Sequence, residues 1–266
     1  MNGAPQQTLL APDDPPPVAV YNGNGRSPFL LVADHAGNIF PRALGRLGIS
    51  AAEAERHIAL DIGIANLSRM VADALDAALI QQTYSRLVID CNRPPAAVTS
   101  IPEVSELTPI PGNVGLTTAE RRAREREIFQ PYHDAIAAAL EQRRQANAPA
   151  ALIALHSFTP VFKAAERPWH AALLYHRDPR LARALIALLR NEAGLTIGDN
   201  EPYFVSDATD YTIPVHGERR NIPHALIEIR QDLIAEEAGQ RQWADRLARI
   251  FGEIETELRK QLLLPG

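Results

Sequence analysis

Short apolar runs that alternate with stretches of helical length constrain the fold of this chain more than any other feature. Residues 29–33, 150–155 and 225–229 are apolar runs of strand length, and polar residues stand at or near the end of each. Amphipathic or capped stretches lie between them. Strands that alternate with helices form mostly parallel or mixed sheets. The sequence therefore predicts an α/β fold, with a mixed, mostly parallel central sheet and helices on both faces.

Capping and proline signals predict the remaining elements. Ser50 and Glu53 form a capping box, which predicts a helix that runs to about residue 78. Residues 84–90 alternate and then become apolar, which predicts a strand that ends at the prolines 94–95, because proline has no amide hydrogen to donate. Residues 96–117 are irregular and long enough to form a lid or a pocket wall. Further predicted elements are a strand at 169–175 and helices at 118–144, 179–191 and 238–262.

The distribution of prolines divides the chain into a short leading segment and one domain. Residues 1–17 contain five prolines and few large apolar side chains, so we expect this segment to be extended or disordered and outside the core. In a chain of 266 residues, 46% of them hydrophobic, the remainder can bury a substantial core. Residues 18–266 are therefore predicted to form a single domain.

Charge and cysteine content exclude several classes of partner. The formal net charge of -5 and the absence of a basic tract argue against nucleic acid as a partner. No apolar stretch reaches the roughly 20 residues needed to cross a bilayer, so we expect no membrane insertion. Cys91 is the single cysteine, and the chain starts without a basic and apolar leader, so we expect a cytoplasmic protein.

Two histidines stand where a metal ion could collect them. Functional side chains in open α/β sheets gather at the carboxyl ends of the strands. His35 and His156 each follow or end an apolar strand, and imidazoles from separate segments are common zinc ligands. The alternative for each is a hydrogen-bonded structural histidine.

Glu228 interrupts an otherwise apolar strand. Burial of a carboxylate in a central strand costs several kcal/mol unless the group is paired or lies beside a metal. A general base would account for that cost. The alternatives are an ion pair with Arg230 or Arg219, or an edge strand from which Glu228 points to solvent.

Arg86, Asn92 and Arg93 flank the strand predicted at residues 84–90. A guanidinium fork presents two donors that match the two oxygens of a carboxylate, which favours an acidic or amino-acid substrate. The alternative is that Asn92 caps a turn and that the arginines are solvated or paired with acids.

Five segments are specific as a set, and together they carry a family resemblance. They read VADHAG at 32–37, SRLVIDCNRP at 85–94, LHSF at 155–158, GDNEPY at 198–203 and HGERRN at 216–221. With these segments the chain resembles the N-formylglutamate amidohydrolase family, which is related to zinc carboxypeptidases and aspartoacylase-type deacylases. The resemblance implies a zinc-carboxypeptidase-like (phosphorylase/hydrolase-like) fold over most of the chain and a single amidohydrolase domain.

The resemblance also implies a zinc site. His35 and His156 correspond to zinc ligands. The wider superfamily usually has a glutamate three residues after the first histidine, but this chain has Asn38 there. Asp61 is the expected replacement, on the helix predicted to follow the His35 loop. His57, on the same face of that predicted helix, is the alternative: in this case it binds the metal instead or holds Asp61 in place.

The remaining roles implied by the resemblance describe a metal-assisted hydrolysis. Glu228 corresponds to the catalytic base that takes a proton from a zinc-activated water and returns it to the departing amine. Arg86 corresponds to the arginine that polarises the scissile carbonyl, and Asn92 with Arg93 to the pair that receives the substrate carboxylate. The expected substrate is a small N-acyl amino acid, with N-formylglutamate as the model.

Three alternatives stay open beside this interpretation. One is a metabolite-binding protein of the same fold that has lost turnover, and another is a small-substrate carboxypeptidase or deacylase. A serine or cysteine hydrolase that uses Ser157 or Cys91 is disfavoured, because neither residue lies in a Gly-x-Ser-x-Gly elbow. Several polar residues that border the segment before Glu228 receive no role: Tyr211, His216, Arg219, Arg220 and His224.

Overall fold

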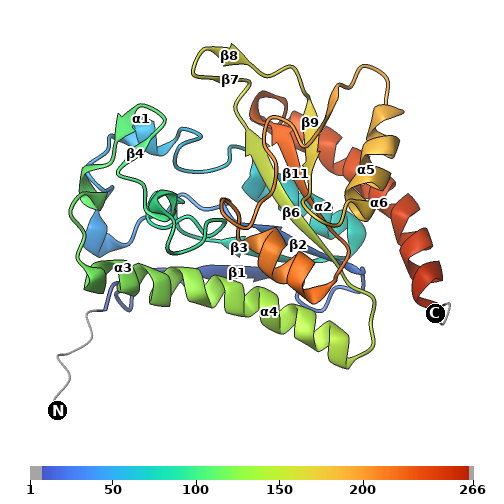
Figure 1. The fold of residues 1–266 in the computed structure, drawn as a ribbon, viewed down its shortest axis with the longest axis horizontal. Coiled ribbons are helices and arrows are strands. Elements are labelled where there is room, and N and C mark those ends of the chain that lie inside the picture. The colour runs from blue at the N-terminus through green and yellow to red at the C-terminus, as the bar shows by residue number, and fades with distance from the viewer. Residues whose placement is uncertain (1–7, 264–266) are drawn as a thin grey trace.

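A seven-stranded sheet forms the centre of the molecule (Figure 1). The computed structural model describes residues 8–263, with side chains up to residue 256. In their order across the sheet, the strands are β1 (Val18–Tyr21), β3 (Ala78–Gln82), β2 (Phe29–Ala33), β6 (Ala151–Phe158), β11 (His224–Arg230), β9 (Ala171–Leu174) and β10 (Ile197–Asp199).

The sheet is mixed and mostly parallel. β3, β2, β6 and β11 run parallel to one another. β1 is antiparallel to β3, β9 is antiparallel to β11, and β10 runs parallel to β9. Every position of β2 and β6 is buried, which explains why these strands appear in the sequence as nearly unbroken apolar runs. The predicted sheet is confirmed.

Helices cover both faces of the sheet. α2, α5 and α6 pack on one face, against strand residues such as Leu31 and Ile153, and α4 packs on the other, against the alternate residues such as Leu30 and Leu152 (Figure 1). The prediction of helices on both faces is therefore confirmed. The α-helices are α1 (Ala51–Ala54), α2 (Ile64–Leu75), α3 (Thr118–Arg124), α4 (Gln130–Gln145), α5 (Arg180–Arg190) and α6 (Glu237–Leu263).

Short elements complete the fold. Two small hairpins, β4 (Val104–Ser105) with β5 (Thr108–Pro109) and β7 (Val161–Phe162) with β8 (Ala165–Glu166), project from the carboxyl side of the sheet. Turns of 3₁₀-helix lie at Arg42–Leu44, Val98–Ser100, Pro111–Asn113, Glu218–Arg220 and Gln231–Leu233, and π-helical turns at Glu125–Phe129 and Ile213–Gly217. No helix in residues 8–263 combines the length and the apolar character needed to cross a membrane.

The helix predicted from residue 50 to about residue 78 is wrong in its middle and at its end. The capping box is present, but α1 stops at Ala54, and the chain turns until α2 begins at Ile64. Gly63 has a positive φ of 83°, and a Cβ on it would lie 2.1 Å from the carbonyl oxygen of Ile234, so this position admits only glycine. His57 and Asp61 therefore lie in a turn and do not share a helix face.

The strand predicted at residues 84–90 is also wrong, because the paired strand is β3 (Ala78–Gln82). Residues 85–92 instead form turns held by side chains. The Ser85 hydroxyl accepts the amide of Leu87 at 3.2 Å, and the Asp90 carboxylate accepts the amide of Asn92 at 2.9 Å. Such local bonds satisfy the backbone without a neighbouring strand.

The leading segment packs against the domain where it is described. Residues 1–7 lie outside the described residues. Residues 8–17 contain no helix or strand, but Leu9 is buried, and the amides of Leu9 and Leu10 donate to Glu127 at 2.8 and 2.9 Å. The expectation that this segment stays outside the core is therefore wrong for Leu9.

Candidate functional site

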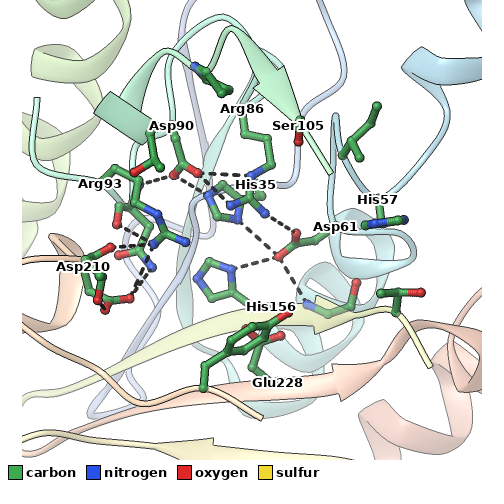
Figure 2. A pocket seen from close by; sticks show the side chains of 18 of the residues that line it. His35, His57, Asp61, Arg86, Asp90, Arg93, Ser105, His156, Asp210 and Glu228 are labelled. Atoms are coloured by element: carbon green, nitrogen blue, oxygen red, sulfur yellow. Dashed lines mark hydrogen bonds and ion pairs between the residues drawn. The ribbon is translucent and has the colours of Figure 1, made fainter. Parts of the chain in front are cut away.

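A cavity of about 550 Å³ lies at the carboxyl ends of β2, β6 and β11 (Figure 2). The alternation of side chains along the strands explains its position. Leu152 and Ala154 of β6 face the core beneath α4, and His156 is the next residue on that face. Leu226 of β11 faces the same core, and Glu228 follows it. The same face therefore changes from apolar core to polar site as the strands end.

Three side chains in this cavity converge on one point. His35 comes from the turn after β2, Asp61 from the turn before α2, and His156 from β6. Their ligand atoms all lie within 4.8 Å of one another, and all three residues are buried. One Asp61 oxygen lies 2.8 Å from His156 Nδ1 and 3.4 Å from His35 Nδ1 (Figure 2). His35 Nδ1 is buried and forms no hydrogen bond within the described chain.

The Nε2 atom of each imidazole, on the side of the ring away from Asp61, contacts a second carboxylate. His35 Nε2 lies 2.7 Å from Asp90, and His156 Nε2 lies 2.9 Å from Asp34. A carboxylate behind each ring fixes the hydrogen on Nε2, which leaves Nδ1 as the lone-pair donor toward the convergence point. Two imidazole nitrogens and one carboxylate are a typical catalytic zinc set with a free coordination position. The residues present therefore fit a divalent metal ion.

The protonation of His156 supports this interpretation. Burial alone would lower the pKa of His156, but hydrogen bonds to Asp34 and Asp61 and the charges of both carboxylates hold it well above its usual value. Burial also opposes the charge of Asp34, yet its bonds to His156 and to the Thr212 hydroxyl, at 2.7 Å, lower its pKa to about 2. The carboxylates thus favour a positive charge at this point, which a proton or a metal ion can supply.

Glu228 faces the cavity beside this cluster. It stands opposite His156 in the β6–β11 register and is 8% exposed, and its Oε2 is buried without a hydrogen-bond partner among the described residues. Burial, together with the negative charge of Asp61, raises the pKa of Glu228 to about 7, although nearby positive charges oppose the shift. A carboxyl group with such a pKa can accept and return a proton near neutral pH. Arg230 is not its partner, because that arginine bonds to Asp232 at 2.8 Å.

Arg86 is tied to the carboxylates of the cluster. Its Nη2 and Nε donate to one Asp90 oxygen at 2.7 and 3.2 Å, and its Nη1 lies 3.4 Å from Asp61. Burial would lower the pKa of Arg86, but Asp90 and Asp61 raise it, so the guanidinium stays charged. Arg86 therefore places a permanent positive charge at the cavity wall and also orients two of the acids.

Asn92 and Arg93 line the same cavity and contact residues 209–212. The Asn92 side-chain oxygen accepts the amides of Tyr211 and Thr212 at 3.2 and 3.1 Å, and its nitrogen donates to Asp210 at 3.3 Å. Arg93 Nη1 donates to the carbonyl oxygen of Thr209 at 2.7 Å. Asn92 thus has a structural task in addition to its predicted one, whereas Arg93 keeps donors for a ligand.

The structure separates the two other ligand candidates from the cluster. Asn38 donates to Glu55 at 3.3 Å on the surface. His57 lines the cavity, but its Nε2 lies 3.5 Å from Glu106 and it does not belong to the metal-ligating group. Asp61 is therefore the third member of the cluster, as expected, although it reaches that point from a turn.

Sequence reasoning missed the residues that support the histidines. Asp34 and Asp90 hold the two imidazoles, and Thr212 holds Asp34. A signal was available for the two acids, because Asp34 directly follows the apolar run 29–33 and Asp90 directly follows the apolar run 87–89. No local signal marks Thr212, which lies far from Asp34 in the sequence.

Comparisons with known proteins agree on one family. The family model described as N-formylglutamate amidohydrolase matches residues 27–235. The crystal structure of a gene product from Agrobacterium tumefaciens shares 34% sequence identity, covers 94% of this chain and 99% of its own, and gives a TM-score of 0.91. The crystal structure of an N-formylglutamate amidohydrolase from Ralstonia eutropha JMP134 shares 20% identity, covers 92% and 99% respectively, and gives a TM-score of 0.68. The comparison with curated proteins gives no match.

Proposed function

The chain belongs to the N-formylglutamate amidohydrolase family, and from this premise we propose that it hydrolyses the amide bond of an N-formyl amino acid. N-formylglutamate is the model substrate, and the products are formate and the free amino acid. One observation carries the proposal: the cluster of His35, Asp61 and His156 shares a cavity with a buried glutamic acid whose pKa is raised to about 7. That combination is suited to hydrolysis of an unactivated amide.

His35, Asp61 and His156 are the residues that would hold a zinc ion. When bound, zinc supplies a positive charge that acidifies water and polarises the scissile carbonyl. Asp90 and Asp34 keep the two imidazoles in the orientation that this task requires, since each accepts a hydrogen bond from the far ring nitrogen.

Glu228 is the proposed proton carrier. As a carboxylate, it accepts a proton from the water that attacks the formyl carbon. As a carboxylic acid, it returns that proton to the amide nitrogen, so the C–N bond breaks with a neutral amine as leaving group. The absence of a hydrogen-bond partner on Oε2 within the described residues leaves this oxygen available for both transfers.

Arg86 and Arg93 are the proposed electrostatic partners of the substrate. Arg86 stands beside Asp61 and Asp90 with its charge fixed, and we propose that it stabilises the oxyanion that forms at the formyl carbon. Arg93, with support from Asn92, receives the α-carboxylate of the amino acid and so positions the scissile bond.

Formate release from N-formyl-L-glutamate tests the proposal directly. The purified protein is stripped with a chelator, reloaded with one equivalent of zinc and assayed in both states. We expect turnover in the zinc-loaded state and its loss after chelation. A fully zinc-loaded protein that binds N-formyl-L-glutamate but releases no formate would support a metabolite-binding protein instead.

A further inference from the structure

Arg167 is a buried cation that the proposed chemistry does not use. It directly follows the β7–β8 hairpin, and its amide donates to the carbonyl oxygen of Pro160 at 2.8 Å, which closes the base of that hairpin. The residue is 8% exposed. Its position is therefore fixed by the backbone, and its side chain points into the molecule.

Aromatic rings surround the guanidinium of Arg167. Its Cζ lies 4.8 Å from the ring centroid of Phe162, 4.8 Å from that of Tyr203 and 6.0 Å from that of Phe158. Its side chain bonds only to uncharged groups among the described residues: a long bond of 3.5 Å runs to the carbonyl oxygen of Thr159, and the Tyr203 side chain is a second partner. Within residues 8–256 no carboxylate forms an ion pair with it.

A second buried arginine shows how unusual this environment is. The guanidinium of Arg124 donates to the carbonyl oxygen of Val88, the side-chain oxygen of Asn113 and the carbonyl oxygen of Gly112, at 2.9, 2.6 and 3.1 Å. Cation–π contacts are worth only about 0.5–2 kcal/mol each and satisfy no N–H group. Arg167 therefore carries a positive charge that no carboxylate among the described residues neutralises.

The residues that frame Arg167 also line the active-site cavity. Phe162, Tyr203 and Thr159 belong to its wall, together with Glu228. The charge of Arg167 reaches across the cavity: burial lowers the pKa of His57, and Arg167 adds to that shift. The guanidinium thus lies next to the cavity, at the wall formed by the β7–β8 hairpin and residues 202–204.

Arg86 and Arg93, which line the cavity, each have a carboxylate of the protein beside them. Arg86 is bonded to Asp90 and Asp61. Arg93 lies 3.6 Å from Asp210, and the acid at the opposite rim, Glu106, is paired with a neighbouring arginine. Arg167, which lies next to the cavity behind Phe162 and Tyr203, has no carboxylate partner among the described residues.

We propose that Arg167 binds the side-chain carboxylate of the substrate and so restricts the enzyme to dicarboxylic N-acyl amino acids. Arg93 and Arg167 then bind the two carboxylates from different walls, with the scissile bond between them beside Glu228. This inference rests on the proposed function, because it assigns a specificity determinant to the same site. A buried charge that meets its counter-ion only in the complex rejects neutral analogues, since these would leave it unpaired.

The test compares N-formyl-L-glutamate with its neutral isostere N-formyl-L-glutamine. For the wild-type protein we expect a kcat/KM at least about 100-fold higher with the glutamate compound. Arg167→Met should reduce kcat/KM for N-formyl-L-glutamate by about 100-fold and change the value for N-formyl-L-glutamine by less than about threefold. Arg167→Lys should recover part of the discrimination, because the charge is restored without the planar fork.

A matched control removes another arginine that lies over a tyrosine ring. Arg183 of α5 lies 5.8 Å from the ring centroid of Tyr175, outside the cavity. Arg183→Met should leave both substrates unaffected. Thermal unfolding of each variant shows whether it is folded, and Arg167→Lys provides the comparison if Arg167→Met does not fold.

The outcomes distinguish this inference from the proposed function. Equal losses for both substrates in Arg167→Met and Arg167→Lys, or a wild-type protein that does not discriminate between the substrates, would overturn the role of Arg167 while hydrolysis stands. If the wild-type protein hydrolyses neither substrate, the proposed function fails. Calorimetric binding of glutarate and glutaramate to the zinc-loaded protein then decides the role of Arg167, which requires a preference for glutarate that Arg167→Met removes.

Discussion

The acid–base character of Glu228 arises because its carboxyl group has apolar neighbours and few hydrogen-bond donors. Its neighbours in β11 are apolar, and Oε2 has no hydrogen-bond donor among the described residues. Each of these features raises the free energy of the charged form. The raised pKa predicts how activity depends on pH. The carboxylate form of Glu228, which acts as the base, becomes more populated as the pH rises through about 7. The value of kcat/KM should therefore fall as the solution is acidified below neutrality.

Replacement of this one residue tests its role as a proton carrier. Glu228→Gln keeps the shape but cannot accept or return a proton, so we expect kcat to fall by about 10²–10⁴-fold. Zinc content should stay the same, because Glu228 does not belong to the His35, Asp61 and His156 cluster. Formate release and metal analysis are measured on the same sample. Loss of zinc together with activity would assign Glu228 to the metal site.

A pair of buried histidines supports the substrate side of the cavity. The Nε2 hydrogen of His133 is donated to the carbonyl oxygen of Cys91 at 2.8 Å, immediately before Asn92. Its Nδ1 then accepts from His216 Nε2 at 3.0 Å, and His216 Nδ1 is buried without a partner in the described chain. Burial lowers the pKa of both rings, so both are neutral near pH 7. The contact with His133 gives His216 a structural role, which the sequence left unassigned.

The neutral pair predicts an acid-sensitive fold. Burial lowers the pKa of His133 to about 4 and that of His216 to about 3, whereas the unfolded chain titrates near 6.5. Between pH 4 and pH 6.5 the unfolded chain therefore binds more protons at these two histidines than the folded chain does. The contribution of the neutral pair to the free energy of unfolding is complete above about pH 6.5 and is lost as the pH falls toward 4. The urea midpoint should decrease from pH 7.5 to pH 5, and His133→Gln/His216→Gln should show a smaller decrease. If the urea midpoint decreased equally in the wild type and in the double variant, the two histidines would not be the cause of the acid sensitivity.

At the scale of elements, the turn before α2 decides where Asp61 lies. Gly63 closes this turn with a left-handed φ and packs directly on the carbonyl of Ile234. Asp61 stands two residues earlier, and its carboxylate accepts a hydrogen bond from the amide of Ser157 at 3.2 Å. The contact between residues 63 and 234 thus brings the segment after β11 against the segment that supplies the third cluster residue.

Gly63→Ala should therefore damage both stability and the metal site. Its Cβ would meet the Ile234 carbonyl, so we expect a loss of more than about 2 kcal/mol in the free energy of unfolding and weaker zinc binding. Gly194→Ala is the matched control, because it has a similar φ of 79° with no atom within 4 Å of the added Cβ. The control should lose only about 1 kcal/mol, the cost of the backbone strain. Equal losses measured by urea unfolding would mean that the close contact has no effect.

The strands that could be predicted are those whose burial is uniform. β2, β6 and β11 lie in the middle of the sheet with helices on both faces, so their apolar runs have one interpretation. β3 was not predicted: the predicted helix ran to about residue 78, where β3 begins, because only Asp76 and Ala77 separate α2 from β3. Residues 84–90 looked like a strand because they are buried, but the side-chain bonds of Ser85 and Asp90 turn the chain there. The sequence pattern therefore predicts which residues are buried more reliably than which segments pair as strands.

At the scale of the whole molecule, the sheet assembles the site from segments far apart in the sequence. The sequence could mark His35, His156 and Glu228 as candidates, because each is a polar residue in or directly after an apolar run, and the structure places all three in one cavity. It could not show that Asp34 and Asp90 stand behind the imidazoles or that Arg167 lacks a counter-ion. Those are relations between side chains across strands and hairpins, and only the folded chain brings them together.

The charge balance of this assembly predicts that metal binding stabilises the entire domain. Asp34, Asp61 and Asp90 surround two imidazoles, so an added dication meets an excess of buried negative charge. A ligand that binds only the folded state at 100 times its Kd contributes about 2.7 kcal/mol. For a domain of this size, that energy raises Tm by about 5–10 °C. Zinc should therefore raise Tm by that amount, and by less at pH 6 than at pH 8, because binding must displace the proton on His156.

Two variants locate the source of that stabilisation. His35→Asn removes a cluster residue and should abolish most of the zinc-induced rise in Tm. His57→Asn changes a histidine that lines the same cavity outside the cluster, so the rise should persist. Differential scanning calorimetry with and without chelator measures both. An equal rise in His35→Asn would place the stabilising ion elsewhere, whereas its loss in that variant alone would connect the three buried ligands to the stability of the whole fold.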